Sequence, residues 1–98
     1  MNQKTNEKEF KCHTLKTDPE PFKAVNAGIK SCEIRFNDRD FQIGDILILK
    51  ETKYTGEEMS NSNADLIYTG RFVKKSITHI LKDIKYGIKP GFAILSFA

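Results

Sequence analysis

The hydrophobic and polar positions of the chain alternate over several short stretches, as they do in strands whose side chains point to opposite faces. The sequence predicts strands over residues 10–16, 31–37, 44–49, 71–81 and 92–97. Between residues 54 and 64 the chain is polar, so we expect a longer loop there, with its most mobile part at residues 60–63.

One helix is predicted after the first strand. Residues 17–19 (Thr-Asp-Pro) offer a capping side chain and a proline suited to a first helical turn. Phe22, Val25 and Ile29 then recur at a spacing that places them on one side of a short amphipathic helix, and Gly28 is its expected terminator. We expect Phe22 and Val25 to anchor this helix in the core.

The resulting order, β-α-β-β-β-β, contains too few helices for a parallel α/β sheet. We therefore assign the chain to the α+β class, mainly β, and expect a small, mostly antiparallel barrel of about five strands with one helix. The 98 residues suffice for a single domain, which we place at residues 10–98. Residues 1–9 are polar and lysine-rich, which predicts a disordered lead-in rather than a secretory signal.

Composition narrows the possible surroundings of the protein. The longest apolar run, Ile46 to Leu49, is far shorter than the roughly 20 residues of a membrane-spanning helix. We therefore expect no membrane contact and a cytoplasmic protein. The formal net charge of +3 permits contact with a polyanion such as a nucleic acid without requiring it.

The two cysteines, Cys12 and Cys32, are isolated in the sequence, which predicts reduced and buried thiols rather than a disulfide framework. Together with His13 and His79 they match no standard spacing of zinc ligands. We therefore expect no metal site and no cofactor.

The second predicted strand concentrates the candidate chemistry. Cys32, Ile34 and Phe36 share one of its faces, and this face is predicted to enter the core. Glu33 and Arg35 share the other face, where an acid and a base are displayed together.

These polar groups are typical of a nucleic-acid surface. The guanidinium of Arg35 can hold a phosphate or a guanine edge through two hydrogen bonds, and Lys30 supplies a point charge suited to a phosphate. Glu33 can orient Arg35 or accept a hydrogen bond from the amino group of a base. The alternative is a simple ion pair between Glu33 and Arg35 on a solvated face.

Further candidates extend this surface. Arg39 and Arg71 add positive charge, and Tyr68 either stacks on a base or packs structurally. His13 either lies at the edge of the same cleft, as a phosphate donor or general base, or is a satisfied and partly buried histidine. Asp45 is expected to accept hydrogen bonds from backbone amides in a turn.

Residues 28–35, Gly-Ile-Lys-Ser-Cys-Glu-Ile-Arg, resemble the G-x-K-x-x-E-x-R signature of the ASCH domains, a branch of the PUA-like superfamily. With further segments in the same order, they resemble the DUF3850 family, small bacterial and phage-associated proteins of unassigned function. These segments are residues 13–16, 37–41, 44–45, 68–71 and 91–97. The resemblance covers nearly all of residues 10–98.

This resemblance implies a PUA-like β-barrel with a cleft between helix and barrel, lined by Lys30, Glu33 and Arg35. It also implies RNA binding, which is the usual proposal for this superfamily. RNA is therefore the expected partner, and a nucleotide or modified nucleoside is the alternative ligand.

Two other functions remain as alternatives. Some small ASCH-like proteins are amidohydrolases acting on N4-acylated cytidine, and Lys30 matches their catalytic lysine. Glu33, however, stands where those enzymes have a nucleophilic threonine, so we favour a binding module over an enzyme. A phage-related protein-interaction adaptor is the third hypothesis, and no sequence feature selects it.

Overall fold

The computed structural model describes residues 9–98, so the lead-in predicted at residues 1–9 lies outside the described residues apart from Glu9. The elements are β1 (Cys12–Thr17), α1 (Pro19–Asn26), β2 (Cys32–Phe36), β3 (Ile46–Thr52), α2 (Gly56–Ser62), β4 (Tyr68–Leu81), the 3-10 turn η2 (Ile84–Tyr86) and β5 (Phe92–Phe97). This content confirms a mainly β fold of five strands with a helix after the first. No helix within residues 9–98 is long and apolar enough to cross a membrane.

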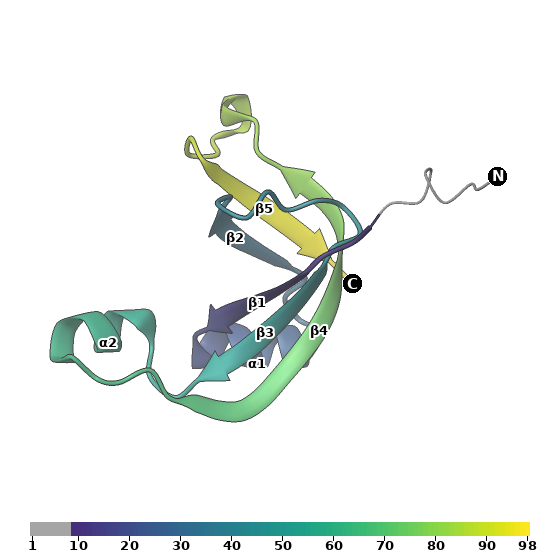
Figure 1. The fold of residues 1–98 in the computed structure, drawn as a ribbon. Helices are drawn as coiled ribbons and strands as arrows, with labels where there is room; N and C mark the ends of the chain where they lie inside the picture. Colours follow the sequence, from purple (N-terminus) through teal and green to yellow (C-terminus); the bar gives the residue numbers. More distant parts are fainter. Residues whose placement is uncertain (1–8) are drawn as a thin grey trace.

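All five strands belong to one sheet, in the order β1-β3-β4-β5-β2. β1 runs parallel to β3, and the other three pairs are antiparallel. β4 is long and strongly bent, so it pairs with β3 through its first half and with β5 through its second (Figure 1). Within residues 9–98 the sheet ends at β1 and β2, which do not pair with each other, so it is not closed into a barrel.

The bend of the sheet encloses one hydrophobic core. As predicted, α1 contributes Phe22 and Val25, which are both almost fully buried. The placement of Ile29 on the same side was wrong, because α1 ends at Asn26 and Ile29 is 82% exposed. Burial of such a side chain contributes roughly 1.5–3 kcal/mol to stability. The buried cluster consists of Leu15, Val25, Phe41, Leu47, Leu49, Ile77, Ala93, Leu95 and Phe97.

β2 faces the opposite way from the prediction. Ile34 and Phe36 are 61% and 55% exposed and Cys32 is also exposed, whereas Glu33 is only 7% exposed. The prediction was wrong because the space behind β2 is a polar cavity, so the charged side of the strand turns inward. The apolar side of β2 lies on the outer surface of the sheet, where the rings of Phe36 and Phe92 meet edge to face with centroids 5.4 Å apart.

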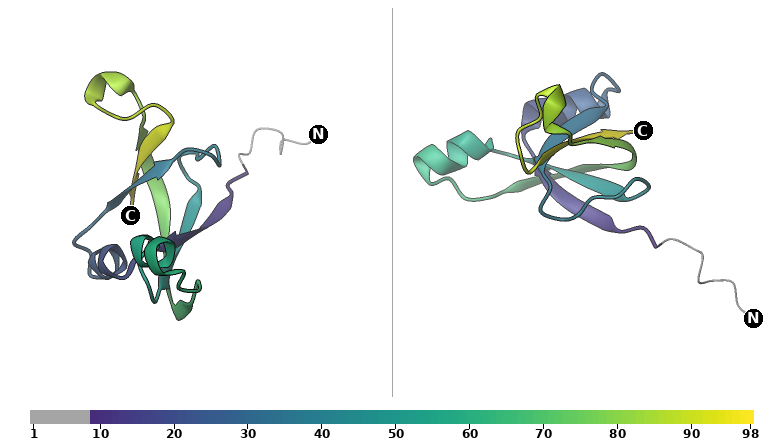
Figure 2. Two further views of the ribbon diagram at one scale, coloured as in Figure 1. Left: turned by 90° about the vertical axis from the view of Figure 1, so that its left-hand side faces the viewer. Right: turned by 90° about the horizontal axis from the view of Figure 1, so that it is seen from above.

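A helix, α2, replaces most of the loop that was predicted at residues 54–64. It begins with a capping box, in which the Thr55 hydroxyl accepts from the Glu58 amide at 3.0 Å and the Glu58 carboxylate accepts from the Thr55 amide at 2.9 Å. Asn63 ends the helix in the left-handed conformation, with φ of 54°. α2 buries no side chain and projects away from the sheet (Figures 1 and 2).

Both cysteines are exposed free thiols, so the prediction that they are buried was wrong. Cys12 is the first residue of β1 and Cys32 is the first residue of β2. Both strands lie at an edge of the sheet. Each thiol therefore stands at the end of an edge strand, on its outward-facing side.

Candidate functional site

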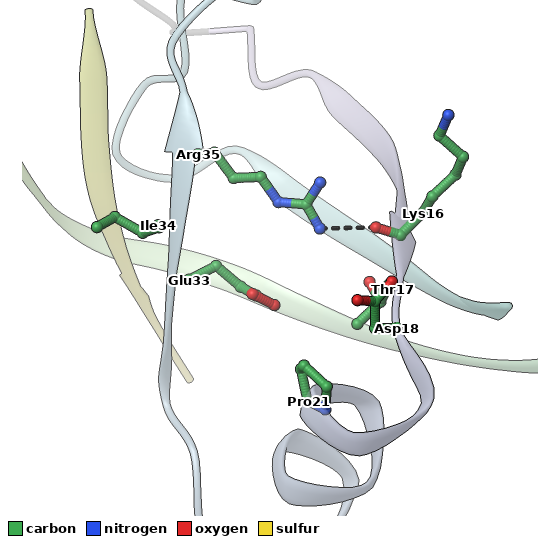
Figure 3. A pocket seen from close by; sticks show the side chains of 7 residues that line it. All are labelled: Lys16, Thr17, Asp18, Pro21, Glu33, Ile34 and Arg35. Carbon is green, nitrogen blue, oxygen red and sulfur yellow. Dashed lines mark hydrogen bonds between the residues drawn. The ribbon is translucent and has the colours of Figure 1, made fainter. Parts of the chain in front are cut away.

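A polar cavity of about 240 Å³ lies between the two edge strands and the start of α1 (Figure 3). Its walls come from the end of β1, the first turn of α1 and the middle of β2. The lining residues are Lys16, Thr17, Asp18, Pro21, Glu33, Ile34 and Arg35. The cavity exists because β1 and β2 do not pair, so side chains rather than backbone hydrogen bonds span the gap between them.

Glu33 brings a buried carboxylate to this cavity. Its Oε2 accepts a hydrogen bond from Lys30 Nζ at 3.1 Å, and the same ammonium donates to the carbonyl of Cys32. Its Oε1 is buried and has no hydrogen-bond partner within residues 9–98. Because a buried carboxylate oxygen without a donor costs free energy, Oε1 is an unsatisfied acceptor in the wall of this cavity.

Two arginines reach the free edge of β1. Arg35 Nη2 donates to the carbonyl of Lys16 at 2.8 Å (Figure 3), and Arg39 Nη1 donates to the carbonyl of Thr14 at 2.8 Å. Neither arginine pairs with a carboxylate in the described part of the chain, so the ion pair between Glu33 and Arg35 considered from the sequence does not form. Both guanidinium charges remain available to an anion.

His13 lies away from the cavity, in a satisfied structural position. Its Nε2 is 2.8 Å from Oδ2 of Asp45, and its ring meets Phe41 edge to face with centroids 4.7 Å apart. Asp45 also accepts from the backbone amides of Lys11 and Gln42, each at 3.1 Å, which confirms its predicted turn role. Burial alone would raise the pKa of Asp45, but the hydrogen bonds from His13 and the two amides outweigh it and lower that pKa.

Arg71 is held by a second buried carboxylate, that of Glu51. Arg71 Nε and Nη2 donate to the two oxygens of Glu51 at 2.8 and 2.9 Å, and the Thr69 hydroxyl donates to Oε1 at 2.7 Å. The hydrogen bonds from Arg71 lower the pKa of Glu51, and the hydrogen bond from Thr69 lowers it further. Burial raises this pKa, but the hydrogen bonds outweigh burial, so the pKa lies below its ordinary value. The same contact raises the pKa of Arg71. Arg71 is therefore an exposed side chain paired with a buried carboxylate, and it does not line the cavity.

Tyr68 lies on the outer face of the sheet rather than beside Glu33. Lys50 Nζ is 4.3 Å from the centroid of the Tyr68 ring, and both residues line a separate groove over β1, β3 and β4. Tyr68 is therefore exposed, but it lines the groove over β1, β3 and β4 and not the cavity beside Glu33, where it was predicted.

The structure thus brings some of the predicted site residues together and separates others. Those at or next to the cavity are Lys30, Glu33, Arg35 and Arg39, and those placed elsewhere are His13, Tyr68 and Arg71. The start of α1 was missed, although Thr17, Asp18 and Pro21 line the cavity. The helix-start signal there was visible in the sequence, but only the sheet order places it opposite β2.

No group of three or more His, Cys, Asp or Glu side chains that could hold a metal ion occurs within residues 9–98.

Comparison with known proteins gives one family. A search of curated proteins finds no significant match to this chain. Residues 12–97 match the family described as Domain of unknown function (DUF3850), from the first residue of β1 to the last residue of β5. The match therefore includes every strand and the whole cavity between β1 and β2. The chain belongs to the DUF3850 family.

Proposed function

We propose that this protein is an RNA-binding module that holds one nucleobase of an RNA chain in the cavity between β1 and β2. We also propose that its open sheet is a variant of the PUA-like barrel of ASCH domains, as the resemblance of residues 28–35 implies. In such a fold the cleft between the helix and the sheet is the ligand site.

The observation that carries the proposal is Oε1 of Glu33, which is buried without a hydrogen-bond partner within residues 9–98. An amino group of a base supplies the missing donor, as N4 of cytosine does for acidic side chains. The cavity of about 240 Å³ is smaller than pockets for drug-sized ligands, which measure roughly 300–1,000 Å³. It therefore suits one heterocycle rather than a longer segment of RNA.

The cavity is lined by two cations, Lys16 and Arg35, and by two carboxylates, Asp18 and Glu33, and the cations lie on the side where a sugar-phosphate backbone would leave it. Arg35 lines the cavity, and Lys16 at its rim directs its ammonium away from it (Figure 3). Arg39 lies next to Arg35 along the edge of β1. In this arrangement the cations contribute affinity for any RNA sequence, and Glu33 contributes base selection.

The geometry favours binding over amide hydrolysis. Lys30, which matches the catalytic lysine of the ASCH-like amidohydrolases, donates to both Glu33 and the carbonyl of Cys32. A lysine engaged in this way is a donor rather than a base. Position 33 also carries no hydroxyl nucleophile.

The test is the affinity of a short, labelled single-stranded RNA of mixed sequence, measured by fluorescence anisotropy. Glu33→Gln should weaken binding about tenfold, since an amide N–H would then face the donor of the base. The matched control is Glu57→Gln in the first turn of α2, which removes an acid at an exposed site. This variant should bind RNA as tightly as the wild type or slightly more tightly, because it reduces repulsion of phosphates.

Equal affinities of the Glu33→Gln and Glu57→Gln variants would exclude Glu33 from the site. Arg35→Ala tests the backbone contact separately. It should weaken binding and reduce the slope of log affinity against log salt by roughly 0.7, the value for one phosphate of a single strand. An unchanged slope would exclude a phosphate contact by Arg35.

A further inference from the structure

The outer face of the sheet carries a second groove, of about 530 Å³, over β1, β3 and β4. We call it the aromatic groove. Its lining residues are Thr14, Ile48, Lys50, Tyr68, Gly70, Phe72 and Lys74. None of them lines the cavity that contains Glu33, so the two sites are separate surfaces on opposite sides of β1.

Two aromatic rings of this groove are open to solvent. Phe72 is 56% exposed and Tyr68 is 38% exposed. Gly70 lies between them along β4, and apart from its chain neighbours no atom of residues 9–98 lies within 4 Å of where a Cβ on Gly70 would stand. The floor between the rings is therefore open. Lys50 Nζ lies over the Tyr68 ring, 4.3 Å from its centroid, so a base would stack on the other face of Tyr68 and on Phe72. Proteins that bind single-stranded nucleic acid stack bases on such rings.

Lysines surround the rings. Lys16 lies opposite Lys50 in the register of β1 and β3, and Lys50 lies opposite Phe72 in the register of β3 and β4. Lys74, opposite Ile48, adds a further positive charge. Among residues 9–98 no carboxylate lines the groove, and none of these lysines forms an ion pair. This pairing of exposed rings with cations matches a partner that is both planar and anionic, rather than an apolar segment of protein.

We propose that the aromatic groove binds single-stranded RNA, with bases stacked on Phe72 and Tyr68 and phosphates held by Lys50 and Lys74. This inference rests on the proposed function for its class of ligand and adds a second surface to it. Lys16 joins the two surfaces, because its carbonyl faces the Glu33 cavity while its side chain points away from it (Figure 3). An RNA strand that leaves the cavity over the edge of β1 would pass Lys16 and then Thr14, which lines the groove.

The test is the affinity of the same short RNA for the full chain carrying both Tyr68→Ala and Phe72→Ala. Loss of two stacking partners should weaken binding at least about tenfold. The matched control is Tyr86→Ala, since Tyr86 is 63% exposed and has Lys85 Nζ 5.2 Å from its ring centroid, but lies outside the groove. The control should bind as the wild type does. A double variant that binds within twofold of the wild type would overturn the proposal.

A conservative pair separates stacking from other effects of the substitutions. Tyr68→Phe with Phe72→Tyr keeps a ring at each position, so its affinity should stay within about twofold of the wild type. Thermal unfolding verifies that both double variants are folded. If the conservative pair loses as much affinity as the alanine pair, stacking is not the cause and the proposal fails.

Comparison with Arg35→Ala distinguishes the groove from the cavity. Loss of affinity in the double alanine variant alone would support the groove and remove the cavity from the RNA-binding surface. Loss in Arg35→Ala alone would retain the cavity and overturn the groove. Losses in both, which multiply in the triple variant, would support one continuous RNA path. A wild-type chain that binds no RNA would overturn both proposals.

Discussion

Two glutamates of this protein are almost equally buried, but their surroundings differ. Glu51 is 3% exposed and Glu33 is 7% exposed. Both oxygens of Glu51 accept hydrogen bonds, from Arg71 and from Thr69. Glu33 is paired only through Oε2, with Lys30, and its Oε1 has no partner within residues 9–98.

The difference separates an acid whose two oxygens are both satisfied within the fold from an acid that has one unsatisfied oxygen. Removal of a carboxylate from water is compensated only when its oxygens are satisfied by good hydrogen bonds and a counter-charge. Glu51 meets this condition with residues of the neighbouring strand. Glu33 does not, and groups that oppose local stability in this way are concentrated at functional sites.

The largest effect on stability is expected for Glu51→Gln. The amide cannot accept both donors of the Arg71 fork, so the free energy of unfolding should fall by about 2 kcal/mol, as for other hydrogen bonds to charged groups. Urea unfolding at neutral pH measures the change. Glu57→Gln, at an exposed position of α2, is the control and should unfold as the wild type does. Equal stabilities of these two variants would show that the Glu51 pair contributes nothing.

A smaller effect is expected from acid. The pKa of Glu51 lies below its ordinary 4.5 and that of Asp45 below its ordinary 3.8. The folded chain therefore binds fewer protons than the unfolded chain, so both acids stabilise it above these values and cease to do so as pH falls through the folded pKa. The stability gap between the wild type and Glu51→Gln should narrow as the pH falls from 7 to 3. A gap of constant size over that range would contradict the lowered pKa of Glu51.

The smallest effect on stability is expected for Glu33→Gln. Its Oε1 has no hydrogen bond to lose, and the neutral amide is less costly to bury than a carboxylate. The amide oxygen of the variant can still accept the hydrogen bond from Lys30 that Oε2 accepts in the wild type. Differential scanning calorimetry should therefore place the variant within about 0.5 kcal/mol of the wild type. A loss comparable to that of Glu51→Gln would assign Glu33 a structural role instead.

Much of the fold could be predicted because local patterns were consistent. Alternation marked the strands, and Phe22 and Val25 marked the buried side of α1. The orientation of β2 could not be predicted, because a period of two shows which side chains share a face but not which face is inside. At α2 the signal was present, since Thr55 and Glu58 have the spacing of a capping box, but polar composition favoured a loop.

The candidate site was predictable where its residues are close in sequence. Lys30, Glu33 and Arg35 meet because the end of one element leads directly into β2. The positions of Arg71 and Tyr68 instead depend on how β4 pairs with β3. This pairing places Glu51 of β3 beside Arg71 of β4. The register between two strands is determined by the whole sheet. The prediction placed Arg71 and Tyr68 beside β2 only because of their residue types, and residue type does not determine strand register.

The contacts of Arg35 and Arg39 with β1 also affect how one molecule meets another. An open sheet offers its edge strands as templates for pairing with strands of other chains, which leads to aggregation. The carbonyls of Thr14 and Lys16 are acceptors that an incoming strand would need, and the two guanidinium groups occupy them. Arg35 and Arg39, which are proposed to contact RNA, thus also hinder strand pairing between molecules at the edge of β1.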